Sequence, residues 1–168
     1  MSRSVSWNQN FRYPKHLSGN LAEQTQILKP FEKWFFDFVR ENCDAKIMYH
    51  GCGRGDDVVG DLIETGVEAL NPVQISAIKD LSELKRRYGR QISFWGGIDT
   101  QHVLTHRSPQ NVETEVRRRI LQLAPEGGYV LAAVHSMQPD VPAKNIVAMG
   151  DAAQKHGAYP MRTDLANM

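Results

Sequence analysis

The chain has 168 residues, 41% of them hydrophobic and 23% charged, a length and composition that suit one domain with a buried core. Its 20 basic and 19 acidic residues leave a formal net charge of +1, which excludes a domain-wide positive field for nucleic acid or an anionic membrane surface. Two cysteines cannot build a disulfide framework, and no apolar run is long enough to span a membrane, so we expect a cytoplasmic protein.

The start of the chain is polar with scattered aromatic residues, and we interpret 1–29 as an irregular lead-in. A helix is expected to begin at Pro30, where the missing N–H of proline costs nothing, and to end near Asn42. Apolar residues at helical spacing predict one stripe along this helix. Its members are Phe31, Trp34, Phe35, Phe38 and Val39.

Four strands are predicted after this helix, at Ala45–Tyr49, Val67–Val73, Ile92–Trp95 and Tyr129–Val134. Each is followed by a segment with helical patterning, and this alternation predicts a parallel α/β sheet. Successive strands begin about 23 to 37 residues apart, near the roughly 31 residues of one unit of a (β/α)8 barrel. A four-stranded doubly wound sheet would fit the same pattern equally well.

Unusual residues follow all four predicted strands. The motifs are His50-Gly51-Cys52-Gly53, Asn71-Pro72-Val73-Gln74, Trp95-Gly96-Gly97-Ile98-Asp99, and His135 followed by Gln138-Pro139-Asp140-Val141-Pro142. In this order, and over about residues 30 to 157, they resemble the uroporphyrinogen decarboxylase superfamily. The resemblance implies an α/β fold that is the C-terminal half, about four β/α units, of a (β/α)8 barrel. It implies a half-barrel domain at 30–168, without the first four strands of the family.

His50 and Cys52 are the first candidate site residues. Side chains two apart on an extended strand share a face, and an imidazole with a thiolate is a good zinc pair. An unmetallated histidine beside a buried free thiol is the alternative. In the methyltransferase branch of the family, His-x-Cys supplies two zinc ligands and a later cysteine the third. His135 stands at that later position, so the resemblance implies a zinc site of His50, Cys52 and His135.

The other strand ends supply candidates for catalysis and substrate binding. We assign Asp99 and Gln74 as catalytic candidates, and Gln74, Trp95 and His135 to substrate binding. Each polar candidate also has a structural reading: Asp99 can cap the next segment, while Gln74 and His135 can satisfy neighbouring backbone groups. His102, in the loop after Asp99, is expected to be exposed.

Three functions follow from the resemblance. The first is methyl transfer at a zinc-held thiolate, from a methyl-corrinoid protein partner to a thiol acceptor. The second is decarboxylation of porphyrinogen acetate side chains, which needs no metal. The third is a non-catalytic half-barrel subunit or fragment. Open sheet edges predict association with a second copy or with a separate N-terminal half, and this chain alone is expected to be catalytically incomplete.

Overall fold

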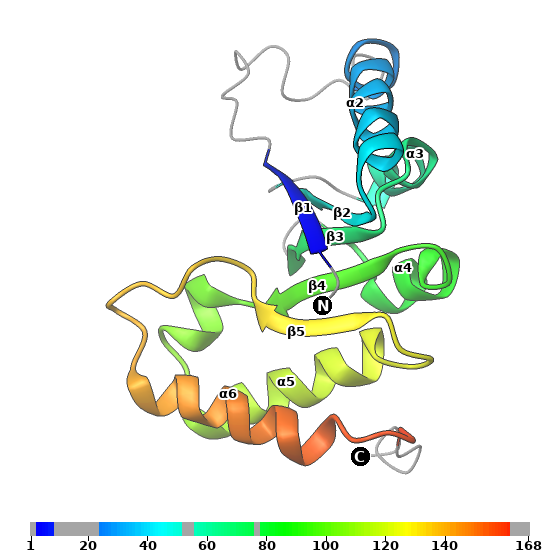
Figure 1. Cartoon of the computed structure of the whole chain (residues 1–168). Coiled ribbons are helices and arrows are strands. Elements are labelled where there is room, and N and C mark those ends of the chain that lie inside the picture. Colours follow the sequence, from blue (N-terminus) through cyan, green and yellow to red (C-terminus); the bar gives the residue numbers. More distant parts are fainter. Residues whose placement is uncertain (1–2, 9–23, 52–55, 76–77, 162–168) are drawn as a thin grey trace.

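Five parallel strands form one sheet, in a computed structural model that describes residues 3–8, 24–51, 56–75 and 78–161 (Figure 1). The strands are β1 (Arg3–Asn8), β2 (Ala45–His50), β3 (Ala69–Val73), β4 (Ser93–Ile98) and β5 (Tyr129–Ala133). They lie side by side in chain order, and every neighbouring pair is parallel. This order excludes a doubly wound sheet, whose strand order reverses at a switch point, and it confirms the barrel-type half fold.

Strand β1 corrects the prediction of an irregular lead-in. Arg3 pairs with Ala45, and the register continues without a break to Asn8 and His50. A short helical segment, η1 (Gln24–Leu28), also lies within 1–29. The sequence Ser4-Val5-Ser6-Trp7 alternates small polar and large apolar residues, which is a strand pattern. Because this part of the chain is polar overall, the alternation does not stand out in the sequence.

Five α-helices alternate with the strands. They are α2 (Lys29–Asn42), α3 (Val59–Thr65), α4 (Leu81–Tyr88), α5 (Pro109–Leu123) and α6 (Ala143–His156), with short turns η2 (Asp56–Val58) and η4 (Thr100–Leu104). Asp80 accepts hydrogen bonds from the backbone N–H groups of Ser82 and Glu83 at the start of α4. Ser108 caps α5 by accepting from the N–H of Asn111. The capping residues in the sequence therefore set these helix starts.

The hydrophobic core lies between the helices and one face of the sheet. Ile47, Tyr49 and Phe94 point to this face and are buried with Phe36 of α2. The neighbouring side chains along the strands point the other way, and Trp95 and Val130 are exposed there. We call this second side the open face of the sheet. Parallel sheets are ordinarily covered on both faces, so the described residues have the form of a barrel segment with one face of the sheet left open.

Helix α2 does not present one apolar stripe to the core. Phe36 and Val39 are buried, whereas Phe31, Trp34 and Phe38 are more than half exposed. Three members of the predicted stripe therefore lie on a side of α2 that faces away from the core. None of the helices in the described ranges is both long and apolar enough to cross a membrane.

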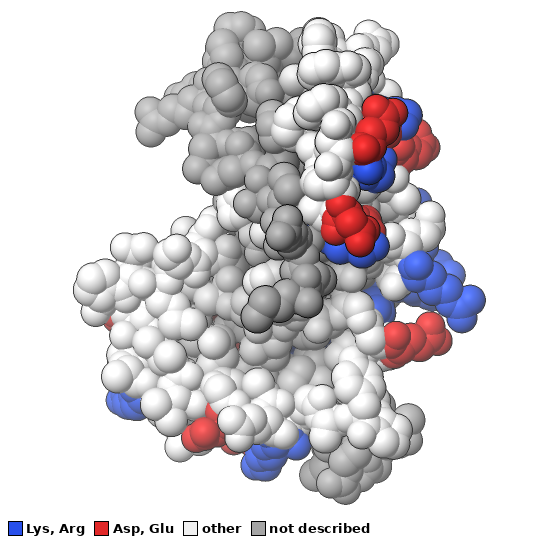
Figure 2. Space-filling model, viewed as in Figure 1, with Lys and Arg blue, Asp and Glu red and all other residues white. Residues whose placement is uncertain are grey.

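Charged side chains are not spread evenly over the surface. In the view of Figure 2, Lys, Arg, Asp and Glu gather along the edge formed by the helices, often with opposite charges side by side. The described helices carry ion pairs such as Lys29–Asp61, Lys33–Asp37 and Arg86–Glu83. The surface therefore has no extended region of one charge sign in that view.

Candidate functional site at the carboxyl ends of the strands

His50, the last residue of β2, and Asn71, in the middle of β3, form a polar pair between two neighbouring strands. They are register partners on β2 and β3, so their side chains share a face, and His50 Nδ1 lies 2.5 Å from Asn71 Oδ1. With the amide in this orientation its oxygen can only accept, so Nδ1 carries the proton. The Nε2 atom of the ring then carries the lone pair, which is the form of histidine that binds metals.

Cys52 lies outside the described residues. The convergence of His50, Cys52 and His135 on one ion therefore stays a prediction. Within the described ranges, no three His, Cys, Asp or Glu side chains are grouped so that they could hold a metal ion. His50 has the orienting partner that a metal-binding histidine commonly has, while Cys52 as a second ligand stays a prediction.

Gln74, Asp99 and His135 line one small pocket of about 30 Å³. Gln74 directly follows β3, Asp99 directly follows β4, and His135 comes shortly after β5. Because parallel strands end on the same edge, three separate strand ends contribute to this pocket. The structure thus brings together three of the predicted site residues at the end where barrel enzymes carry their chemistry. Their individual roles stay predictions.

Asp99 has a structural task at this edge. Its Oδ1 accepts hydrogen bonds from the backbone N–H of Gln101, at 2.7 Å, and of His102, at 2.8 Å. These bonds cap the turn η4, as the structural reading of Asp99 predicted. The side chain is half-buried and also lines the pocket, so capping fixes the carboxylate at its wall.

His102 belongs to this pocket as well. It is exposed, as expected, but it lines the same wall as Asp99 and His135. The sequence signal for this placement is that His102 follows Asp99 by three residues, within one helical turn. Trp95 lies elsewhere: it is exposed on the open face, paired with Val130, and it is not among the residues that line the small pocket. The pocket and the open face are therefore separate parts of the candidate site.

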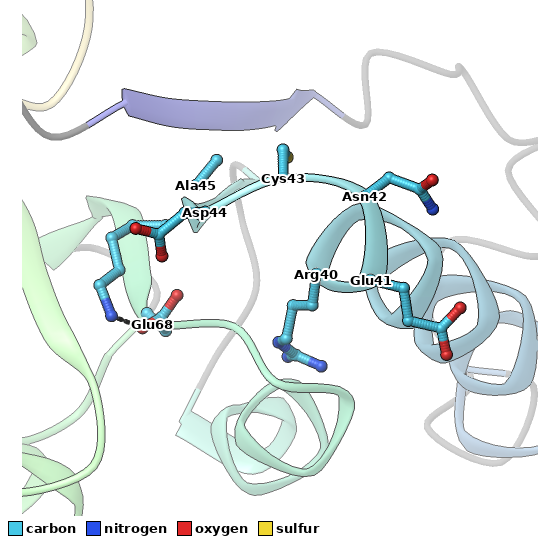
Figure 3. A pocket seen from close by; sticks show the side chains of 8 residues that line it. Arg40, Glu41, Asn42, Cys43, Asp44, Ala45 and Glu68 are labelled. Atoms are coloured by element: carbon cyan, nitrogen blue, oxygen red, sulfur yellow. Dashed lines mark hydrogen bonds and ion pairs between the residues drawn. The ribbon is translucent and has the colours of Figure 1, made fainter.

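A larger pocket, of about 530 Å³, lies at the opposite end of the strands (Figure 3). Arg40, Cys43, Lys46 and Glu68 contribute to its lining, and Lys46 forms a 2.6 Å ion pair with Glu68 across it. This is the amino end of β2, which in barrels supports stability and not chemistry. We therefore do not assign the site to the larger pocket.

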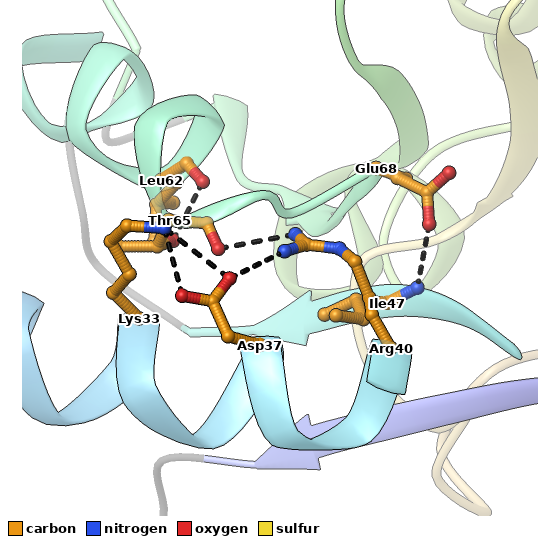
Figure 4. A network of polar contacts seen from close by, with 7 residues as sticks. All are labelled: Lys33, Asp37, Arg40, Ile47, Leu62, Thr65 and Glu68. Carbon is orange, nitrogen blue, oxygen red and sulfur yellow. Dashed lines mark hydrogen bonds and ion pairs between the residues drawn. The ribbon is translucent and has the colours of Figure 1, made fainter. Parts of the chain in front are cut away.

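The polar contacts beside this pocket hold α2 to its neighbours (Figure 4). Arg40 bonds the Asp37 carboxylate and the carbonyl oxygen of Thr65 at the end of α3. Glu68 accepts from the backbone N–H of Ile47. A bond from Lys33, the largest cause, lowers the pKa of Asp37. These contacts connect elements of the fold. We therefore assign the candidate site to the carboxyl ends of the strands.

A parallel sheet in chain order, covered by helices on one face and carrying polar residues at its carboxyl edge, defines a segment of a (β/α)-barrel protein. The family described as uroporphyrinogen decarboxylase (URO-D) matches residues 17–156, and the chain belongs to this family. The match begins at residue 17, upstream of the predicted domain start at residue 30 and within the predicted lead-in.

One solved structure with the same fold is described as a methyltransferase from Methanosarcina mazei. It is 21% identical, with a TM-score of 0.62, and the alignment covers 80% of this chain. The chain spans only 37% of that protein's length. No curated protein matches the chain.

Proposed function

We propose that this chain carries part of a zinc-thiolate methyl-transfer site, in which a methyl group passes from a methyl-corrinoid protein to a thiol acceptor. The observation that carries the proposal is the hydrogen bond between His50 Nδ1 and Asn71 Oδ1, at 2.5 Å. An acceptor bonded to one ring nitrogen orients the other toward a metal and raises its basicity. Two residues later, Cys52 supplies the thiolate that zinc favours.

In this proposal His50 and Cys52 hold the ion, with His135 as the third protein ligand. Zinc, when bound, would lower the pKa of an acceptor thiol, so that its thiolate is available near neutral pH. Asn71 would fix a proton on Nδ1 of His50, so that Nε2 is the nitrogen left to bind the ion. Gln74 and Asp99 would orient the acceptor from the small pocket next to His135.

Two comparisons support a chemistry of this superfamily, of which the methyltransferases are one branch. The chain belongs to the uroporphyrinogen decarboxylase family, and a structure of similar fold is described as a methyltransferase. Since the chain spans 37% of that structure, we propose that a complementary N-terminal half covers the open face. Its strands would pair with the edges at β1 and β5, and we expect this assembly in the cytoplasm.

Zinc content and methyl transfer from methylcobalamin to a thiol test the proposal. The full chain is compared with Cys52→Ala, and Cys43→Ala serves as the matched control because that thiol lies at the opposite end of the strands. We expect Cys52→Ala to lose bound zinc and Cys43→Ala to retain it. Zinc bound equally well by Cys52→Ala would exclude a metal site that uses this cysteine.

Decarboxylation of a porphyrinogen is the second candidate. It is favoured by the pocket that joins Gln74, Asp99 and His135, in which the Gln74 amide and the His135 ring could donate hydrogen bonds to a substrate carboxylate without a metal. Under this function, a zinc-free preparation supplied with the missing half would release carbon dioxide. His135→Ala would abolish that release, and Cys52→Ala would leave it unchanged.

A further inference from the structure

An apolar seam runs along the outer side of η1 and α2. It consists of Ile27, Phe31, Trp34 and Phe38, whose exposed fractions are 53%, 70%, 69% and 54%. Their spacing of four, three and four residues places them on one side of the helix, in the pattern of the contact positions of a coiled coil. We call these four residues the α2 seam.

The other sides of α2 already have partners. Phe36 and Val39 are buried against the sheet. Lys29 bonds Asp61 and Glu64 of α3, at 2.7 and 2.5 Å. The α2 seam is a third side, and within the described ranges its four large side chains remain more than half exposed. Contiguous exposed apolar side chains of this size mark an interaction surface.

The area of the α2 seam approaches what a stable interface needs. Three aromatic residues and an isoleucine, each more than half exposed, offer on the order of 500 Å² of apolar surface on the usual area scale for such side chains. A standard interface takes about 800 Å² from each partner, and Trp and Phe are enriched at its centre. Two ion pairs beside the seam, Lys33–Asp37 and Asp37–Arg40, share the Asp37 carboxylate and lie within α2.

We propose that the α2 seam pairs with the same seam of a second copy, with the two helices antiparallel about a twofold axis. The spacing of four, three and four reads the same in both directions. An antiparallel pair therefore sets Phe31 against Trp34 of the second copy and Ile27 against Phe38. This self-complementarity is what an isologous interface requires. The dimer does not depend on the proposed zinc site, since the seam contains none of its residues.

Sedimentation velocity of the full chain tests the dimer. We expect the unmodified chain to shift from monomer to dimer in the micromolar range. Phe31→Lys and Trp34→Glu should each raise the dissociation constant at least tenfold. The control Val147→Glu changes an exposed apolar residue of α6 and should leave the dissociation constant unchanged. Circular dichroism checks that each variant keeps its helices.

Mixing the two disrupted variants tests the antiparallel arrangement. In an antiparallel heterodimer Lys from Phe31→Lys meets Glu from Trp34→Glu, and the remaining Phe–Trp contact is intact. The mixture should therefore dimerise where neither variant does alone. A mixture that stays monomeric would overturn the antiparallel pairing. An unmodified chain that is monomeric at tens of micromolar, or a Val147→Glu chain that dissociates as readily as Trp34→Glu, would overturn the interface itself.

Discussion

The phenol of Tyr129 on β5 donates a 3.0 Å hydrogen bond to the carbonyl oxygen of Gly96 on β4. A Cβ atom on the next residue, Gly97, would lie 2.9 Å from that same phenol oxygen, and Gly97 has a φ of +87°. The partly buried tyrosine thus occupies the space that a side chain at residue 97 would need. Burial raises the pKa of Tyr129, so the phenol stays protonated as a donor throughout the physiological range.

Gly97→Ala is expected to destabilise the fold by about 1–3 kcal/mol, because it combines a left-handed backbone with displacement of Tyr129. Urea unfolding gives the free energy of unfolding. The matched control is Gly150→Ala, in α6, where a Cβ meets nothing within 4 Å. That change should stabilise the chain by about 0.5–1 kcal/mol, since alanine is the better helix former. Equal effects of the two changes would contradict the proposed role of Gly97.

Asn71→Leu removes the acceptor that orients the His50 ring. If the zinc proposal holds, the affinity for zinc should fall about 10- to 100-fold, as when other partners of metal-bound histidines are removed. Competition with a chromogenic chelator measures this affinity. Asn42→Leu is the control, because that amide bonds the carbonyl oxygen of Phe38 at the C-terminal end of α2, beside the pocket at the opposite end of the strands. An unchanged affinity in Asn71→Leu would mean that the His50–Asn71 bond serves only the fold.

Two substitutions of Asp99 distinguish a capping role from a catalytic role. Asp99→Ala should cost about 1 kcal/mol of stability, because two backbone N–H groups of η4 lose their acceptor. Asp99→Asn keeps a good capping side chain but removes the charge, so stability should be retained. If the carboxylate takes part in the reaction, Asp99→Asn loses activity while its urea midpoint stays normal. Full activity in Asp99→Asn would assign the residue to capping alone.

Acid stability should depend on Asp61. A hydrogen bond from Lys29, the largest cause, lowers the pKa of this carboxylate, and Thr25 adds to the effect. A lowered pKa in the folded state contributes stability above the unfolded value of about 3.9, and this contribution disappears as the pH falls through the folded pKa. Asp61→Asn should therefore reduce stability at neutral pH and flatten its decline below pH about 4. Urea midpoints between pH 2 and 7 measure both effects, and Lys29→Met should produce the same flattening.

The strands and helices after residue 29 could be predicted from local signals, for physical reasons. Asp80 and Ser108 occupy capping positions whose chemistry is local, and the strands are short apolar runs that end at glycine or polar residues. Residues 3–8 were missed because the partner that makes them a strand, β2, lies about 40 residues away. Exposure of Phe31 and Trp34 could not be read from their spacing, because helical periodicity identifies a face but not what covers it.

The sequence predicts the individual residues of the candidate site but not which of them lie together. Gln74, Asp99 and His135 follow different strands, and chain-order pairing of those strands brings them to one pocket. The bond from His50 to Asn71 depends on the register of β2 against β3, which no single segment specifies. His102 joined the pocket through a turn whose start is fixed by Asp99.

The register of β3 against β4 changes once along the strand. Leu70 pairs with Phe94 and Val73 with Gly96, so β3 advances three residues where β4 advances two. Residues three apart on a regular strand would face opposite sides of a sheet, yet Leu70 and Val73 are both buried. The extra residue in β3 therefore determines on which face of the sheet Gln74 lies. Deletion of one residue between Leu70 and Val73 would leave the other side chains of β3 unchanged but would move Gln74 to the opposite face of the sheet. The pocket therefore depends on the number of residues in this stretch as well as on their identities.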